Sequence, residues 1–191
     1  PAPVTALTQS WLLESRDLHW RELTAADLAA PVATPDDATL EALRELAERL
    51  ARTAAEQVRR ERPETVTVDR TKLNASDVVT AADLAAERLL REILAAERPD
   101  DAILGEEGGA TAGTSGLTWV VDPIDGTVNY LYGLPSSSVS VAVVAGEPDP
   151  ARWEVLAGAV TDITTGATTS AARGRGAHHE GARLEVAEPV P

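Results

Sequence analysis

Residues 117–130 read LTWVVDPIDGTVNY, and they predict a buried strand that ends in two acidic side chains. The apolar run Leu117–Val121 is typical of a strand inside a sheet. Pro123 keeps Asp122 extended, so the Asp122 carboxylate continues the direction of the strand. A turn after Pro123 then brings Asp125 near Asp122. The stretch therefore predicts two carboxylates together at the end of one strand.

The residues after Asp125 predict a short helix that begins beside these carboxylates. Gly126 permits unusual dihedral angles and close approach of the backbone to a ligand. Thr127 can cap a helix that runs to Tyr132 and ends at Gly133. Free N–H groups at such a helix start, next to bound cations, form a phosphate site. The pattern D-x-x-D-G-T alone is equally typical of an Asx-type turn with a helix cap and no ligand.

A second pair of acidic residues favours the ligand-binding interpretation. Glu106 and Glu107 follow a predicted strand at 102–104, and no Lys or Arg occurs between residues 99 and 151. Carboxylates at the ends of adjacent buried strands repel one another unless protons or cations lie between them. No Cys or His is nearby, so the donors are all oxygen, including the Ile124 carbonyl, and suit Mg²⁺.

The first predicted helix covers residues 37–62. Its apolar side chains recur at steps of three and four residues, and Glu and Arg occupy the opposite face. Asp36 or Asp37 can cap its start, and Pro63 ends it.

A second helix is predicted over residues 81–98. Thr80 is its expected N-cap, and Asp83 follows three residues later in a capping-box arrangement. The apolar residues that this helix is predicted to bury are Leu84, Leu89, Leu90, Ile93 and Leu94.

Short strands alternate with turns over the remaining sequence. They are predicted at residues 65–68, 102–104, 118–121, 138–145, 153–161, 167–172 and 183–186. A flexible loop is predicted at 108–116 and a turn at 146–150, and His178 and His179 are expected in an exposed hairpin loop. Two helices followed by mostly hairpin-linked strands indicate an α+β fold, with the helices packed on an antiparallel sheet. Residues 1–37 are predicted to be an N-terminal extension and residues 38–191 a metal-binding α+β subdomain.

The composition limits the classes of partner. The chain of 191 residues has 17 Lys and Arg against 31 Asp and Glu, a formal net charge of −14. This charge argues against nucleic acid or an anionic membrane as the main partner, because both bind positive surfaces. No apolar run approaches the roughly 20 residues of a membrane span, and no signal peptide is evident. These features predict a cytoplasmic protein.

Several blocks of the sequence resemble one known family. The run from Trp119 to Tyr130, followed by Gly133-Leu-Pro135, closely resembles the signature of the inositol monophosphatase family of Mg²⁺-dependent, lithium-sensitive phosphatases. Gly105-Glu-Glu107 and the segment from Lys72 to Asp83 match two further family blocks in order and spacing. The resemblance spans roughly residues 38–190 and implies the N-terminal half of the αβαβα sugar-phosphatase fold.

The resemblance also implies a set of metal ligands. Glu106, Asp122 and the Ile124 carbonyl would bind a first Mg²⁺, and Asp122 and Asp125 a second. Glu106 would also border a third, weaker ion, and Li⁺ would inhibit. Glu107 is a further candidate in this region.

Roles in catalysis follow from the same resemblance. Thr127 paired with Asp83 would orient and deprotonate the attacking water, although capping competes as the role of Asp83 and both roles are compatible. The N–H groups of Gly126 and Thr127 would hold the phosphate, and Lys72 is a further candidate. The implied reaction is in-line attack of a metal-activated water on inositol 1-phosphate or a related small polyol phosphate.

The same sequence blocks leave alternative functions open. Histidinol-phosphate, fructose-bisphosphate and phosphoadenosine-phosphate phosphatases are alternatives with the same chemistry. Family members continue beyond the position of Pro191 into an α/β half with a Trp-Asp-x-Ala-Ala-Gly block, and this sequence has no such block. We therefore expect a homodimer or pairing with the missing C-terminal half. A catalytically incomplete interaction module is the alternative of another class.

Overall fold

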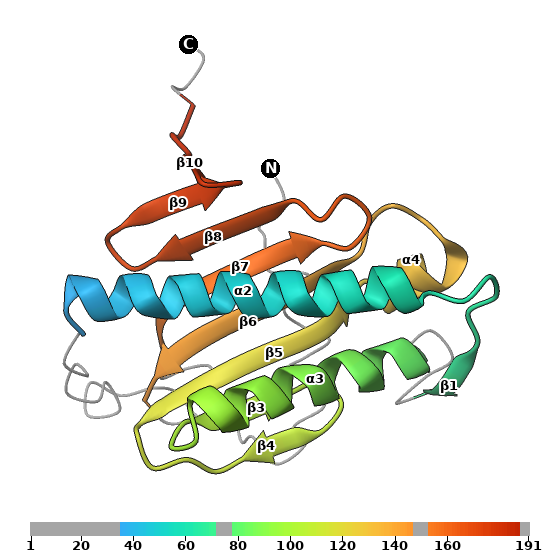
Figure 1. Cartoon of the computed structure of the whole chain (residues 1–191), viewed down its shortest axis with the longest axis horizontal. Helices are drawn as coiled ribbons and strands as arrows, with labels where there is room; N and C mark the ends of the chain where they lie inside the picture. Colours follow the sequence, from blue (N-terminus) through green and yellow to red (C-terminus); the bar gives the residue numbers. More distant parts are fainter. Residues whose placement is uncertain (1–34, 72–77, 147–152, 188–191) are drawn as a thin grey trace, which may run out of the picture. The chain divides into compact units, whose positions relative to one another are not determined.

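The computed structural model describes residues 35–71, 78–146 and 153–187, which form two long helices, one short helix and two sheets. Helices α2 (Asp37–Glu61) and α3 (Ala81–Glu97) lie side by side on one face of an eight-stranded sheet (Figure 1). This arrangement confirms the predicted α+β class. None of the helices in the described part of the chain is long and apolar enough to cross a membrane.

Helix α2 forms as its sequence pattern predicts. The Asp36 carboxylate accepts a hydrogen bond of 2.8 Å from the Thr39 N–H and so caps the helix start. The helix ends at Glu61. The next residue, Arg62, has a non-helical conformation, and Pro63 follows it. The residues that it buries share one face: Leu40, Leu43, Leu46, Ala47, Leu50, Ala51, Ala54, Ala55 and Val58.

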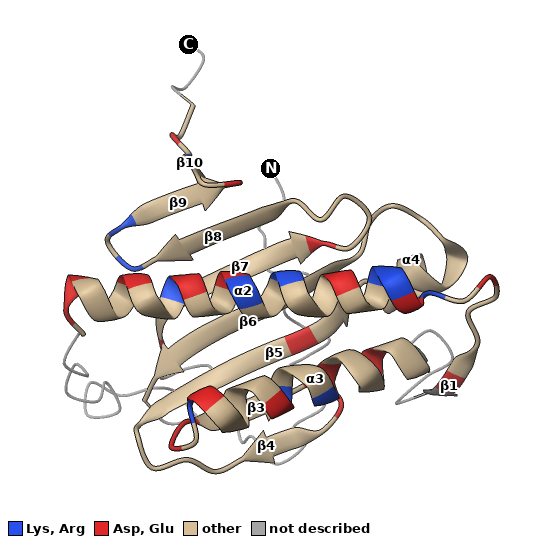
Figure 2. Cartoon of the chain, in the orientation of Figure 1, with Lys and Arg blue, Asp and Glu red and all other residues tan. Residues whose placement is uncertain are grey.

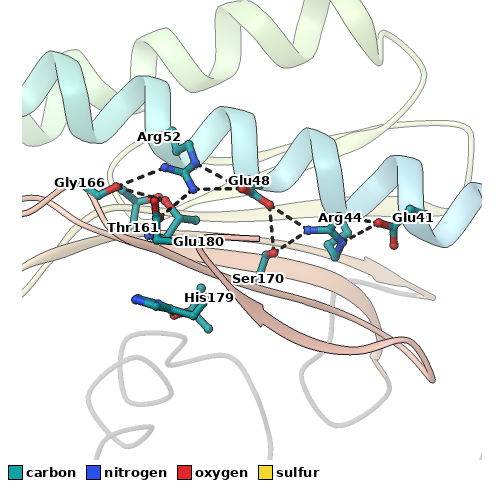
Figure 3. A network of polar contacts seen from close by, with 11 residues as sticks. Glu41, Arg44, Glu48, Arg52, Thr161, Gly166, Ser170, His179 and Glu180 are labelled. Carbon is teal, nitrogen blue, oxygen red and sulfur yellow. Dashed lines mark hydrogen bonds and ion pairs between the residues drawn. The ribbon is translucent and has the colours of Figure 1, made fainter. Parts of the chain in front are cut away.

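Acidic and basic residues alternate along the exposed side of α2 (Figure 2), and some of them link the helix to the sheet. Arg44 donates to Glu48 at 2.9 Å and to the Ser170 hydroxyl at 2.8 Å (Figure 3). Arg52 bridges Glu48 at 3.2 Å and Glu180 at 2.8 Å. Partly exposed pairs of this kind contribute modestly to stability, so the position of α2 depends mainly on its apolar face.

Helix α3 confirms the predicted bounds and capping box but not all of its predicted core. Leu90 and Leu94 are buried, Leu89 and Ile93 are half-buried, and Leu84 is exposed. The prediction for Leu84 was wrong because the helix turns a different face to the sheet. The residues on that face are Asp83, Ala86, Glu87, Leu90 and Leu94.

The large sheet has the strand order β10-β9-β8-β7-β6-β5-β3-β4. Its strands are β3 (Ala102–Gly105), β4 (Gly109–Thr111), β5 (Leu117–Asp125), β6 (Ser138–Ala145), β7 (Glu154–Asp162), β8 (Thr168–Ala172), β9 (Gly176–His179) and β10 (Ala182–Arg183). A separate antiparallel pair joins β1 (Val68–Thr71) and β2 (Val78–Thr80).

The large sheet is mainly antiparallel, as predicted, and contains one parallel pair, β3 and β5. Strand β4 folds back along one edge of β3, and β5 then pairs with the other edge of β3 in the parallel direction. The other neighbouring pairs in this sheet are antiparallel. Because β3 and β5 are parallel, their carboxyl ends meet at the same edge of the sheet, and Gly105 lies opposite Val121.

Some predicted strand positions were also wrong. The strand expected at 65–68 lies at Val68–Thr71, where β2 supplies a partner. The loop expected at 108–116 contains β4, and β9, which includes His178 and His179, was missed. Whether these segments form strands depends on pairing with a neighbouring strand, which their own composition does not reveal. Residues 1–34 of the predicted extension, most of the turn at 146–150 and Lys72 lie outside the described residues.

Candidate metal and phosphate site

The parallel ends of β3 and β5 bring two of the predicted site residues together. Glu106 directly follows β3, and its N–H donates to the Val121 carbonyl at 3.3 Å, next to Asp122 on β5. The Glu106 carboxyl group lies within hydrogen-bonding reach of the Asp122 side chain and raises the pKa of Asp122. Two carboxyl groups in contact share a proton or need a cation between them, since two negative charges there repel.

The Asp122 carboxyl group is poorly solvated. Its Oδ1 atom is buried and has no hydrogen-bond partner among the described residues. Burial, and next the neighbouring Glu106 carboxylate, raise the pKa of Asp122 to about 9, and the charges of Asp125 and Asp83 act in the same direction. A buried oxygen without a partner needs a specific explanation, and a bound cation supplies one.

A bulge in β5 brings Asp125 to the same region. Asp122 lies opposite Ser140 and Asp125 opposite Ser138 on β6, so β5 has one residue more than its partner over this interval. Residues three apart on a regular strand point to opposite faces, and the extra residue allows both carboxylates to face one side. The strand continues through Asp125, so the bulge takes the place of the predicted turn.

Asp83 contacts both Thr80 and Thr127. Its Oδ2 atom accepts a hydrogen bond from the Thr80 N–H at 2.8 Å, which is one half of the capping box, and another from the Thr80 hydroxyl at 2.5 Å. Its Oδ1 atom accepts from the Thr127 hydroxyl at 3.1 Å. Asp83 is 1% exposed, and burial raises its pKa while the bonds from Thr80 and Thr127 oppose that rise.

Helix α4 (Thr127–Tyr132) follows β5 through Gly126, which has a φ of 87°. Gly126 is the N-cap and Thr127 the first helical residue, so the prediction that Thr127 caps the helix was wrong by one position. The Thr127 hydroxyl also lies 2.9 Å from the Ile124 carbonyl. Buried Tyr130 packs against the Arg62 guanidinium, 4.2 Å from the ring centre, and anchors α4 to the end of α2.

The oxygen donors of these residues suit a hard divalent cation. The described side chains do not form a complete set of metal ligands. No three His, Cys, Asp or Glu side chains in the described part of the chain are arranged to hold a metal ion. The donors near the unpartnered Asp122 Oδ1 are nevertheless all oxygen, which suits Mg²⁺. The ligand roles of Glu106, Asp122, Asp125 and the Ile124 carbonyl stay predictions.

Glu107 is half-buried, and its charge contributes to the raised pKa of Asp83. Glu87 is a buried residue that the sequence analysis missed. It lies one turn after Asp83 on the face of α3 that packs on the sheet, and its carboxylate accepts hydrogen bonds from the Glu107 and Gly108 N–H groups. The available signal was an acidic residue at an apolar position of the helix, four residues after Asp83.

The fold and these residues define a member of a phosphatase family. The Inositol monophosphatase family model matches residues 39–191, and the chain belongs to this family. It is 43% identical over 150 residues to the Inositol-1-monophosphatase SuhB of Mycobacterium tuberculosis, covering 71% of this chain and 50% of that relative. It is 37% identical over 153 residues to the Nus factor SuhB of Pseudomonas aeruginosa, covering 74% and 51%.

The structural comparison agrees with the family assignment. The crystal structure of the extragenic suppressor protein SuhB from Bartonella henselae superposes with a TM-score of 0.69 at 28% sequence identity. The match covers 78% of this chain and 55% of that one. The chain thus spans about half the length of the relatives that it matches, in agreement with the expected half of a larger fold.

Proposed function

We propose that this chain supplies the metal- and phosphate-binding half of a Mg²⁺-dependent phosphatase. Its substrate would be inositol 1-phosphate or a related small polyol phosphate. The observation that carries the proposal is the contact between Glu106 and Asp122 at the ends of β3 and β5, where a buried Asp122 oxygen has no described partner. Family membership and the M. tuberculosis relative's name support the phosphatase chemistry.

In the proposed reaction a water oxygen attacks the phosphorus in line with the leaving polyol oxygen. Mg²⁺ held by Glu106, Asp122, Asp125 and the Ile124 carbonyl would make the water more acidic and neutralise the leaving oxygen. The Thr127 hydroxyl, between Asp83 and the Ile124 carbonyl, orients the water. Asp83 accepts the proton of the water through Thr127, and its raised pKa favours this role. The N–H groups of Gly126 and Thr127 hold the phosphate.

The remaining features of the proposal come from the family. We infer that two or three Mg²⁺ ions bind, that Li⁺ inhibits, and that the protein acts in the cytoplasm as a homodimer or paired with a second α/β half. Histidinol-phosphate, fructose-bisphosphate and phosphoadenosine-phosphate are alternative substrates. A substrate panel distinguishes these possibilities.

Mg²⁺ is expected to stabilise the folded chain, because the folded state alone gathers the carboxylates. At about ten times its Kd, a ligand specific for the folded state contributes about 1.4 kcal/mol, which corresponds to a rise in Tm of about 3–6 °C for a domain of this size. Thermal denaturation with and without MgCl₂ measures the shift, and an equal ionic strength of NaCl is the control. An unchanged Tm over a Mg²⁺ titration into the millimolar range contradicts the metal site.

Asp83→Asn is expected to lower kcat for inositol 1-phosphate by about 100-fold or more, because the amide cannot accept the proton. Stability is expected to change little, since the Asn oxygen can keep the Thr80 capping bonds while its NH₂ faces Thr127. Thr127→Ser keeps the hydroxyl and serves as the conservative control, whereas Thr127→Val is expected to match Asp83→Asn. The comparison requires that the wild-type protein hydrolyses inositol 1-phosphate under the same conditions. A normal kcat of Asp83→Asn then excludes Asp83 as the proton acceptor.

An interaction module without turnover is the second candidate function. It is favoured by the relative named Nus factor SuhB, to which the chain is 37% identical over 153 residues. The discriminating measurement is hydrolysis of inositol 1-phosphate by this chain alone with Mg²⁺, which we expect to be poor. Turnover close to that of a full-length relative excludes the module.

A further inference from the structure

We propose that Glu87 is a positioning residue that fixes the loop carrying Glu106, and thereby places the Glu106 carboxylate against Asp122. This inference rests on the proposed function for its consequence, which is Mg²⁺ affinity. Its structural part, the anchoring of the loop, can be tested without any metal.

Glu87 is 2% exposed, yet it carries a carboxylate. Both of its oxygens accept backbone hydrogen bonds from the loop that follows β3: Oε2 from the Glu107 N–H at 2.6 Å and Oε1 from the Gly108 N–H at 2.8 Å. Arg91, one turn further along α3, donates to Oε1 at 2.7 Å. A buried carboxylate with these three donors is satisfied in this loop conformation, and it loses two of them if the loop moves.

Arg91 extends the same anchor to β4. Its guanidinium donates to the Gly109 carbonyl at 2.5 Å and to the Thr111 hydroxyl at 3.0 Å. The loop between β3 and β4 is therefore held at successive points by two side chains of one helix. Before this loop, the Glu106 N–H donates a hydrogen bond to the Val121 carbonyl on β5. Residue 106 thus lies between two anchored backbone positions.

The glycines of the loop match the space that the Glu87 carboxylate occupies. A Cβ atom at Gly105 would lie 2.5 Å from Glu87 Cδ, and one at Gly108 would lie 2.6 Å from Glu87 Oε1. Any side chain at either position would displace the carboxylate or the loop. The sequence Gly105-Glu-Glu-Gly108 and the buried Glu87 therefore form one complementary unit.

Glu87 and Asp83 together give α3 a defined role in the site. The two carboxylates lie one helical turn apart on the same buried face, where Asp83 accepts from Thr127 after β5 and Glu87 holds the loop after β3. Groups that orient metal ligands in this way typically change metal affinity by 10- to 100-fold when they are altered. Glu87 is expected to act on Mg²⁺ affinity through the position of Glu106 and without touching the ion.

The test compares Glu87→Gln with the wild-type chain. Glu92→Gln is the matched control, because Glu92 is exposed on the same helix. Amide hydrogen exchange of Glu107 and Gly108, measured by NMR without Mg²⁺, is expected to accelerate about 10-fold or more in Glu87→Gln and to stay unchanged in Glu92→Gln. The Mg²⁺ concentration at the midpoint of the Tm shift is expected to rise by about 10- to 100-fold in Glu87→Gln alone.

Unchanged exchange at Glu107 and Gly108 in Glu87→Gln overturns the anchoring role. Faster exchange with an unchanged Mg²⁺ midpoint overturns the link to Glu106. A wild-type chain without any Mg²⁺ response overturns the proposed function and the affinity part of this inference, while the exchange data still decide the anchor. If Glu87→Gln does not fold, Gly108→Ala disturbs the contact between the loop and Glu87 while the charges of Glu87 and Arg91 remain. Faster amide exchange and a higher Mg²⁺ midpoint are then expected of Gly108→Ala.

Discussion

Asp122→Asn is expected to raise the Tm of the magnesium-free chain and to abolish its response to Mg²⁺. In the wild-type chain, burial and the adjacent Glu106 carboxylate raise the pKa of Asp122 to about 9, so the fold is destabilised at neutral pH by the need to hold this group protonated. A neutral amide removes that penalty. We expect a gain of about 1–3 kcal/mol in the free energy of unfolding, because the amide itself must still be desolvated.

Thermal denaturation of both chains with and without Mg²⁺ measures the two effects together. Glu107→Gln is the matched control, since it removes a neighbouring half-buried carboxylate. Its response to Mg²⁺ is expected to persist. A full Mg²⁺ shift in Asp122→Asn, combined with its loss in Glu107→Gln, means that Glu107 is the ligand. A lower Tm of metal-free Asp122→Asn is incompatible with the electrostatic account.

Gly126→Ala is expected to destabilise the chain by about 2–4 kcal/mol, which lowers Tm by about 5–15 °C. Gly126 has a φ of 87°, where side chains are strained, and its added Cβ would lie 2.8 Å from the Ser136 carbonyl oxygen. Relief of this overlap would move the start of α4, and with it the Thr127 hydroxyl, away from Asp83.

Gly133→Ala is the matched control for this substitution, because Gly133 ends the same helix with a φ of 72° and its added Cβ would make only an ordinary van der Waals contact, 3.7 Å from Arg62 Nη2. Its cost is expected to be the backbone strain alone, about 1 kcal/mol. Equal losses in the two variants, measured by denaturant unfolding, indicate that the Ser136 contact is unimportant and that α4 tolerates displacement.

The sequence predicted the elements whose signals are local. The apolar steps of α2, the Thr80–Asp83 capping box and the long strand β6 emerge at or near their expected bounds. The strand expected at 65–68 moved because β2 is its partner, and β4 formed in an apparent glycine loop because β3 has a free edge. Pairing between strands is not encoded in the composition of either strand alone.

The same distinction applies to the site. Pro123 and the acidic residues around it predicted the carboxylates, and the structure brings Glu106 against Asp122 and Asp83 against Thr127. The bulge that turns Asp125 to the same side depends on register with β6, and the role of Glu87 depends on which face of α3 meets the sheet. Neither register nor helix rotation can be derived from one segment.

The parallel pairing of β3 with β5 is expected to affect the lifetime of the folded chain. In the unfolded chain Glu106 and Asp122 are separated by the whole β4 segment and screened by solvent and salt, and their repulsion begins only when the two strands pair. If that pairing forms after the folding barrier, relief of the repulsion mainly slows unfolding. A divalent ion would then prolong the native state while leaving the speed of its formation nearly unchanged.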